Sequence, residues 1–338
     1  MTTAMKRALL ITLVWLLPVV SGCDRAEPVR QSGIVVKVGF VGPLQGPEGP
    51  RGEDTLEGVM TAQALQPLLP NGDRLEIITA DSGVDPQSAR TAMRRLVEED
   101  GVVALLLALD SEALLEVAAF ADSLETPLVA LIASHPDVVA DTAHIVQLPF
   151  DDTTQSTVAA LFVRDELLIK RAAVIANPDN PHSRYLTETF ERKFITTGGD
   201  LTGSHAVADI SDELLRHLQA KNTELLYLPL SAQAALEVVS ALGAIGWAPE
   251  IMTSDGLLAS IQGAYPDRVH ELEGVYATDL FSDTGEFVKH RRLGRQAEVS
   301  FSDLFHSRKN TFTGLGVEGY ALLVDAINRC ASSNDRQC

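Results

Sequence analysis

One glycine pattern in the sequence is of the kind that holds nucleotide phosphates. Gly314, Gly316 and Gly319 form a G-x-G-x-x-G run just before a predicted helix. A dinucleotide site needs an apolar strand before such a run, because strand and helix together position the loop that cradles the pyrophosphate. The preceding residues, RKNTFT, are polar. The run is therefore interpreted as a site of close helix packing, and no cofactor is expected.

Other spacings that support catalysis or metal binding are missing from the sequence. It contains no G-x-x-x-x-G-K-[ST], H-E-x-x-H, C-x-x-C or G-x-S-x-G run, and its eight histidines lack the paired spacing of metal ligands. An exported enzyme would need a nucleophile or an acid and base pair that no pattern supplies. The sequence therefore favours a protein that is not an enzyme and holds no metal.

Several polar or small residues lie where predicted strands end and helices begin: Ser111, Ala133, Ser134, Ser231 and Asp255. Backbone N–H groups at a helix start, together with a hydroxyl group, can hold a carboxylate, and a fixed acid can hold an ammonium. Ser111 is also expected to cap its helix, and capping the next short helix is the alternative role of Asp255.

The elements that would position these residues follow a repeated order of apolar strand, polar turn and amphipathic helix. Unbroken apolar runs such as 102–109 are typical of parallel strands covered by helices on both faces. Asp85 and Pro86 predict a helix start by side-chain cap and first-turn proline. The expected strands are 34–42, 75–80, 102–109, 128–133, 145–148, 172–176, 201–207, 225–228, 251–253 and 274–278. The expected helices are 52–69, 86–100, 111–124, 152–168, 182–197, 211–221, 231–245 and 316–329.

This order predicts an α/β fold: two doubly wound parallel-sheet lobes with a ligand cleft between them. Residues 34–150 plus about 281–330 are assigned to lobe 1, 151–280 to lobe 2 and 331–338 to a C-terminal tail. The chain has 338 residues, 46% of them apolar, which is enough for two domains. Its formal charge of −19 would repel phosphate backbones, so no nucleic acid partner is expected.

The N-terminus is typical of an export signal. Lys6 and Arg7 precede an apolar stretch, 8–20, that is too short to span a bilayer, so residues 1–22 are expected to be a signal peptide.

The exit of this signal, VSGC, resembles the lipobox of bacterial lipoproteins, in which the cysteine is acylated and becomes the new N-terminus. Cys23 would then anchor the protein, with 23–33 as a flexible tether. Asp24 implies, by the same resemblance, retention on the periplasmic side of the inner membrane. Ordinary cleavage with an unmodified Cys23 is the alternative.

Two further cysteines, Cys330 and Cys338, lie close together in the sequence. In an oxidising compartment they are expected either to form a disulfide or to remain as two thiols on the tail.

Six segments carry a resemblance to the type I periplasmic binding proteins, in the branch that binds leucine, isoleucine and valine for ABC transporters. They are VKVGFVGPLQGP (36–47), VDPQSARTAMRRLV (84–97), ETPLVALIASHP (125–136), RAAVIANPDNPHSRYLTETF (171–190), LGAIGWAPEIMTSDG (242–256) and VEGYALLVDAI (317–327). The resemblance covers about residues 34–330.

The resemblance assigns roles to the polar residues above. Ser111, Ala133 and Ser134 match the positions that bind a ligand carboxylate, and Asp255 matches the acid that binds its ammonium. His182 stands where the family places a cleft-lining tyrosine, although an exposed histidine at a helix start is the alternative. Ser231 is a weaker candidate.

The chain departs from the family in three ways. Arg51 stands roughly where binders of aliphatic ligands place an aromatic ring, which favours a polar or acidic ligand side chain if Arg51 faces the cleft rather than water. The first-lobe disulfide is absent, and the chain ends soon after its last predicted helix. The implied function is capture of an amino acid or similar small polar solute for an ABC permease. The alternative is a sensor or assembly protein with the same fold.

Overall fold

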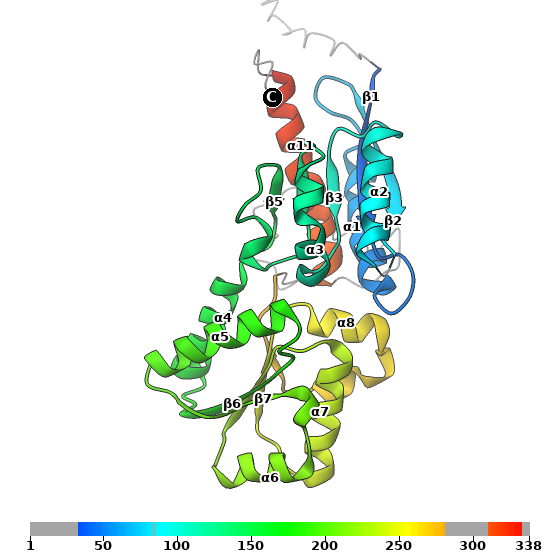
Figure 1. Cartoon of the computed structure of the whole chain (residues 1–338). Coiled ribbons are helices and arrows are strands. Elements are labelled where there is room, and N and C mark those ends of the chain that lie inside the picture. Colours follow the sequence, from blue (N-terminus) through cyan, green and yellow to red (C-terminus); the bar gives the residue numbers. More distant parts are fainter. Residues whose placement is uncertain (1–32, 84, 281–309, 333–338) are drawn as a thin grey trace, which may run out of the picture.

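The computed structural model of the chain describes residues 33–83, 85–280 and 310–332. They form two α/β lobes, one above the other in Figure 1, with the N-terminal strand and the last helix both in the upper lobe. The expected signal peptide, most of the expected tether, Cys23 and the segment 281–309 all lie outside the described residues. Within the described ranges, no helix combines the length and hydropathy needed to cross a membrane.

The first lobe contains a five-stranded sheet in the order β2-β1-β3-β4-β5, with every neighbouring pair parallel. Its strands are β1 Val35–Gly42, β2 Arg74–Asp81, β3 Leu105–Leu107, β4 Leu128–Ala130 and β5 Ile145–Gln147. Helices α1 (Gly49–Leu65) and α11 (Thr311–Ser332) bury apolar residues against one face. Helices α2 (Pro86–Glu98) and α3 (Ser111–Asp122) cover the other face.

The second lobe repeats this arrangement with the parallel order β10-β9-β8-β6-β7. Its strands are β6 Arg171–Ala176, β7 Asp200–Ala206, β8 Leu225–Leu228, β9 Glu250–Thr253 and β10 Tyr276–Ala277. Helices α4 (Asp152–Leu161) and α5 (Pro181–Thr196) pack on one face, and α6 (Asp212–Ala220), α7 (Ala232–Ile245) and α8 (Leu257–Ala264) on the other. The predicted class, two doubly wound parallel-sheet lobes, is confirmed.

The predicted elements are present with shifted bounds. The last helix begins at Thr311 rather than Gly316, and α4 passes at Phe162 into a π-helical turn. Asp85 caps α2 as predicted, because its side chain accepts a hydrogen bond from the Ser88 N–H. The predicted cap of α3 by Ser111 is wrong. Asp110 is the N-cap, and its carboxylate accepts from the Ala113 N–H.

Within the glycine run, Gly316 serves close helix packing, as interpreted from its sequence context. A Cβ at Gly316 would lie 2.1 Å from the backbone oxygen of Thr55 on α1. A Cβ at Gly58 would lie equally close to the Thr313 oxygen on α11. Only glycine at both positions lets the two helices approach this closely. This contact fixes α11 on the first lobe.

Near the end of α11, Cys330 is disulfide-bonded. Its expected partner, Cys338, lies outside the described residues.

Candidate functional site

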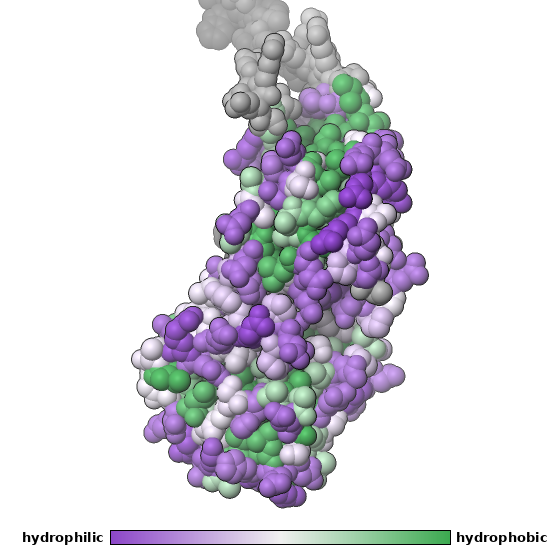
Figure 2. Space-filling view, viewed as in Figure 1, coloured by the Kyte–Doolittle hydropathy of each residue, from purple (hydrophilic) through white to green (hydrophobic). Residues whose placement is uncertain are grey.

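A cavity of about 570 Å³ lies between the two lobes. Arg51, Asp110 and Ser111 line it from the first lobe, and His182 and Asp255 line it from the second. All five follow or adjoin the carboxyl ends of strands, where open parallel sheets place their ligand crevices. On the face shown in Figure 2, hydrophilic side chains predominate where the lobes meet, while apolar ones gather over the upper lobe.

Side chains from the two lobes touch beside this cavity. Asn180, the N-cap of α5, donates from Nδ2 to Glu112 Oε2 on α3 at 2.7 Å. The His135 ring meets the Tyr185 ring edge to face, with centroids 4.8 Å apart. The backbone N–H of Asp152 also donates to the Ser134 oxygen at 3.0 Å. The lobes are therefore joined at one wall of the cavity.

The first-lobe wall is organised around Ser111. Its Oγ accepts hydrogen bonds from the backbone N–H groups of Ser134 and His135, each at 3.1 Å. A serine oxygen has two lone pairs, and both accept hydrogen bonds here. The Ser111 hydroxyl can therefore interact with a third group only by donating its proton. Ser111 and Ser134 are both buried, and both line the cavity.

An ion pair occupies the same wall. Asp110 Oδ1 accepts from the Ala113 N–H at 2.8 Å, and its Oδ2 lies 2.9 Å from Arg51 Nη2. The same nitrogen of Arg51 lies 3.2 Å from Glu48 Oε2. Burial opposes ionisation of Asp110, but Arg51 and the Ala113 N–H outweigh it and hold its pKa below the ordinary value.

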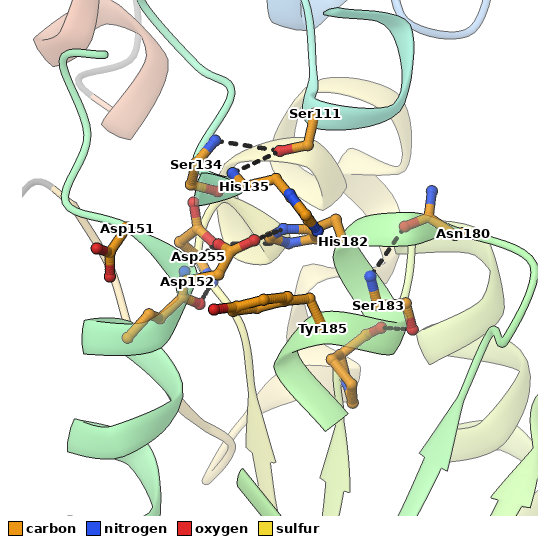
Figure 3. A network of polar contacts seen from close by, with 12 residues as sticks. Ser111, Ser134, His135, Asp151, Asp152, Asn180, His182, Ser183, Tyr185 and Asp255 are labelled. Carbon is orange, nitrogen blue, oxygen red and sulfur yellow. Dashed lines mark hydrogen bonds and ion pairs between the residues drawn. The ribbon is translucent and has the colours of Figure 1, made fainter. Parts of the chain in front are cut away.

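The second-lobe wall carries a histidine between two aspartates, grouped below Ser111 and Ser134 in Figure 3. His182 Nδ1 lies 2.9 Å from Asp152 Oδ2, and His182 Nε2 lies 3.9 Å from Asp255 Oδ1. The Asp152 side chain is fully buried, whereas His182 is 25% and Asp255 11% exposed.

The protonation of this group follows from its burial and its charges. Burial disfavours the imidazolium of His182, but the Asp152 carboxylate outweighs it and raises the pKa of His182 to about 9. Burial raises the pKa of Asp255 to about 6, in part opposed by His182 and reinforced by Asp152. At neutral pH, His182 is therefore charged, and Asp255 is ionised at a cost to the fold.

A buried glutamine fixes the position of Asp255. Gln155 Nε2 donates to Asp255 Oδ1 at 2.7 Å, and the Asp255 N–H donates to Gln155 Oε1 at 3.0 Å. The Thr278 hydroxyl donates to the same Oε1 at 2.8 Å. Because both edges of the amide are used, the carboxylate is held at the end of β9 and the start of α8.

The structure brings together six of the seven binding candidates predicted from the sequence. Those that line the cavity are Arg51, Ser111, Ser134, His182, Ser231 and Asp255. Ser231 is exposed and caps α7. Ala133 differs, because its side chain is fully buried in the apolar core of the first lobe.

Sequence analysis missed Asp110, Asp152 and Gln155. Asp110 and Asp152 each lie at a helix start after a strand. An acidic residue at such a position is a signal from which the sequence could have predicted them. Nothing in the sequence singles out Gln155. Among the described residues, no group of three or more His, Cys, Asp or Glu side chains could hold a metal ion.

A family model described as periplasmic binding protein matches residues 35–338. The chain belongs to the periplasmic binding protein family.

Solved structures share the fold of this periplasmic binding protein. The leucine-binding protein LivK from Thermotoga maritima has a TM-score of 0.76 at 22% identity, covering 89% of this chain and 85% of that one. LivJ from Streptococcus pneumoniae in complex with isoleucine has a TM-score of 0.76 at 17% sequence identity, and the match covers 87% of this chain and 84% of LivJ. A solute-binding protein from Rhodopseudomonas palustris in complex with 3,4-dihydroxybenzoic acid has a TM-score of 0.71 at 14% sequence identity, and the match covers 89% of this chain and 82% of that one.

These likenesses show that the chain has the type I periplasmic binding protein fold. A search of curated proteins gives no match.

Proposed function

We propose that this protein is an extracytoplasmic solute-binding protein of an ABC transporter, that it captures an amino acid or related small polar solute, and that it is not an enzyme. The observation that carries the proposal is the cavity between two lobes, with Asp255 fixed on one side and Ser111 and Arg51 on the other. Relatives of the same fold are described as binding leucine, isoleucine or a dihydroxybenzoic acid.

The walls of the cavity suit a solute that is enclosed from both sides. A charged group that leaves water must be paired on arrival, and preformed partners reduce the ordering cost of binding. Gln155 holds Asp255, while the N–H groups of Ser134 and His135 hold Ser111. Contacts between the lobes, such as Asn180 to Glu112, would add to the stability of the closed form. A ligand that touches both lobes would populate that form for a permease.

A thermal-shift screen of residues 24–338 against amino acids, amines, aromatic acids and small polar solutes tests this proposal. At least one solute should raise the melting temperature, because a ligand that binds only the folded chain stabilises it, by about 2.7 kcal/mol at a hundred times Kd. Isothermal titration of the solutes that raise it would give their affinities. A flat response across the whole panel would contradict solute capture.

The proposed location is the periplasmic side of the inner membrane, with the lipid anchor on Cys23 predicted from the sequence. The full chain, expressed in a bacterial host, should partition into the detergent phase of a phase-separation assay because its acyl chains bury many methylenes. The Cys23→Ser variant should remain in the aqueous phase. Equal partitioning of the two chains would remove the anchor from the proposal.

A further inference from the structure

The charged side chains around the cavity are mostly acidic. Among the described residues that line it, the acids are Glu48, Asp110, Glu112 and Asp255, and the bases are Arg51 and His182. Both bases already have carboxylate partners: Asp110 and Glu48 contact Arg51, and Asp152 contacts His182. Within the described part of the chain, the cavity lining therefore has negative charge in excess and no cation whose charge is left uncompensated.

A carboxylate of the protein lies beside the place where a ligand carboxylate would be held. Free N–H groups at the start of α3 attract an anion, and Asp110 takes one of them, because its Oδ1 accepts from the Ala113 N–H. Its other oxygen takes Arg51 Nη2 at 2.9 Å. A ligand carboxylate beside Ser111 would therefore meet Asp110 as a like charge, with Arg51 already shared between Asp110 and Glu48.

The opposite wall offers a site for positive charge. Asp255 receives one hydrogen bond from Gln155, and the described cation that pairs with it, His182, lies 3.9 Å away and is bound more closely to Asp152 at 2.9 Å. A cation placed against Asp255 would relieve the cost of its burial.

We infer that the cleft selects an organic cation that carries no carboxylate, such as an amine, amidine or guanidine solute, with Asp255 pairing the cationic group and Asp110 excluding carboxylates. The inference rests on the proposed function of solute capture and narrows its ligand class. It assigns Asp110 a role in specificity that goes beyond its role as a helix cap.

Matched pairs of probes test the ligand class. Leucine is compared with leucinamide and isopentylamine, and arginine with agmatine, by isothermal titration of residues 24–338. In at least one pair, the member without a carboxylate should bind at least about tenfold more tightly. A tenfold ratio of Kd values is a difference of about 1.4 kcal/mol in binding free energy. If, in every pair that binds, the acid binds as well as its carboxylate-free partner, the inference is overturned. The absence of binding by every cationic probe also overturns the inference. The anionic and neutral solutes of the wider screen then decide whether the proposed function is correct.

The Asp110→Asn variant tests the role of that residue. Asparagine caps helices about as well as aspartate, so α3 should persist while the negative charge is lost and Arg51 gains freedom to pair with a ligand carboxylate. The preference for the carboxylate-free probe should fall about tenfold or reverse. Asp85→Asn is the matched control, because Asp85 caps α2 in the same way but does not line the cavity. Equal preference ratios in the native protein and Asp110→Asn, with both chains folded by melting curve, would overturn the role of Asp110.

Discussion

Replacement of His182 by leucine is expected to lower the free energy of unfolding by about 3–5 kcal/mol, the usual cost of removing one partner from a buried ion pair. The cost arises at Asp152, whose side chain is fully buried and whose Oδ2 lies 2.9 Å from His182 Nδ1. Its other oxygen has no hydrogen-bond partner in the described part of the chain, so no protein group there would compensate the charge. Urea denaturation at pH 7 measures the loss.

The pH dependence of this loss has a definite sign. The folded pKa of His182 is raised to about 9 from an ordinary 6.5. Its contribution to stability is therefore fully present below about pH 6.5 and disappears as pH rises through about 9. The difference in unfolding free energy between the native protein and His182→Leu should narrow over this range.

A second histidine provides the matched control. His144 Nδ1 lies 3.3 Å from Asp122 Oδ1, but these side chains are 35% and 23% exposed, so His144→Leu should cost at most about 1 kcal/mol. Adding Asp152→Asn to His182→Leu removes the uncompensated charge and should recover much of the stability. Similar losses in the two histidine variants, or no recovery in the double variant, would contradict the assignment of a buried pair.

The fold was predictable because apolar runs report burial. The run 225–228 corresponds residue for residue to β8. The runs 102–109 and 128–133 are longer than β3 and β4, since Ala108 and Leu131, for example, are buried although they lie beyond the strand ends. Apolar character cannot separate residues paired within the sheet from buried residues in the loops that follow. Those loops lead directly to the site.

Much of the cleft was predictable for the related reason that the carboxyl ends of parallel strands meet at one edge. The pairing of Asp152 with His182 was not predictable from the sequence, because it depends on how α4 and α5 pack against each other. The cap of α3 was assigned to the wrong residue since Asp110 and Ser111 are both good capping residues in sequence. Packing decides between them: the Ser111 oxygen already accepts from Ser134 and His135.

The Asp255→Asn variant is expected to be more stable than the native protein at pH 7.5 and weaker in binding. The folded pKa of Asp255 is raised to about 6 from an ordinary 3.8, so its ionisation costs stability as pH rises from about 4 to 6, and the cost persists above that. Asparagine carries no charge and can still accept the hydrogen bond from Gln155 Nε2. The gain should reach up to about 3 kcal/mol at pH 7.5 and vanish below pH 4.

The same substitution should weaken binding of the best cationic solute by roughly 2–5 kcal/mol, the cost of truncating one partner of a buried charge pair. A cation beside Asp255 lowers its pKa, so binding to the native protein near pH 6 should release a proton, and binding to Asp255→Asn should not. Titration calorimetry in buffers of different ionisation enthalpy measures this proton. Asp267→Asn, at an exposed position that does not line the cavity, is the control for a general loss of negative charge. Unchanged affinity together with unchanged proton release in Asp255→Asn would place the cationic group elsewhere. A stability gain alone would then mark Asp255 as a buried acid without a ligand, because only a binding role predicts that stability and affinity change in opposite directions.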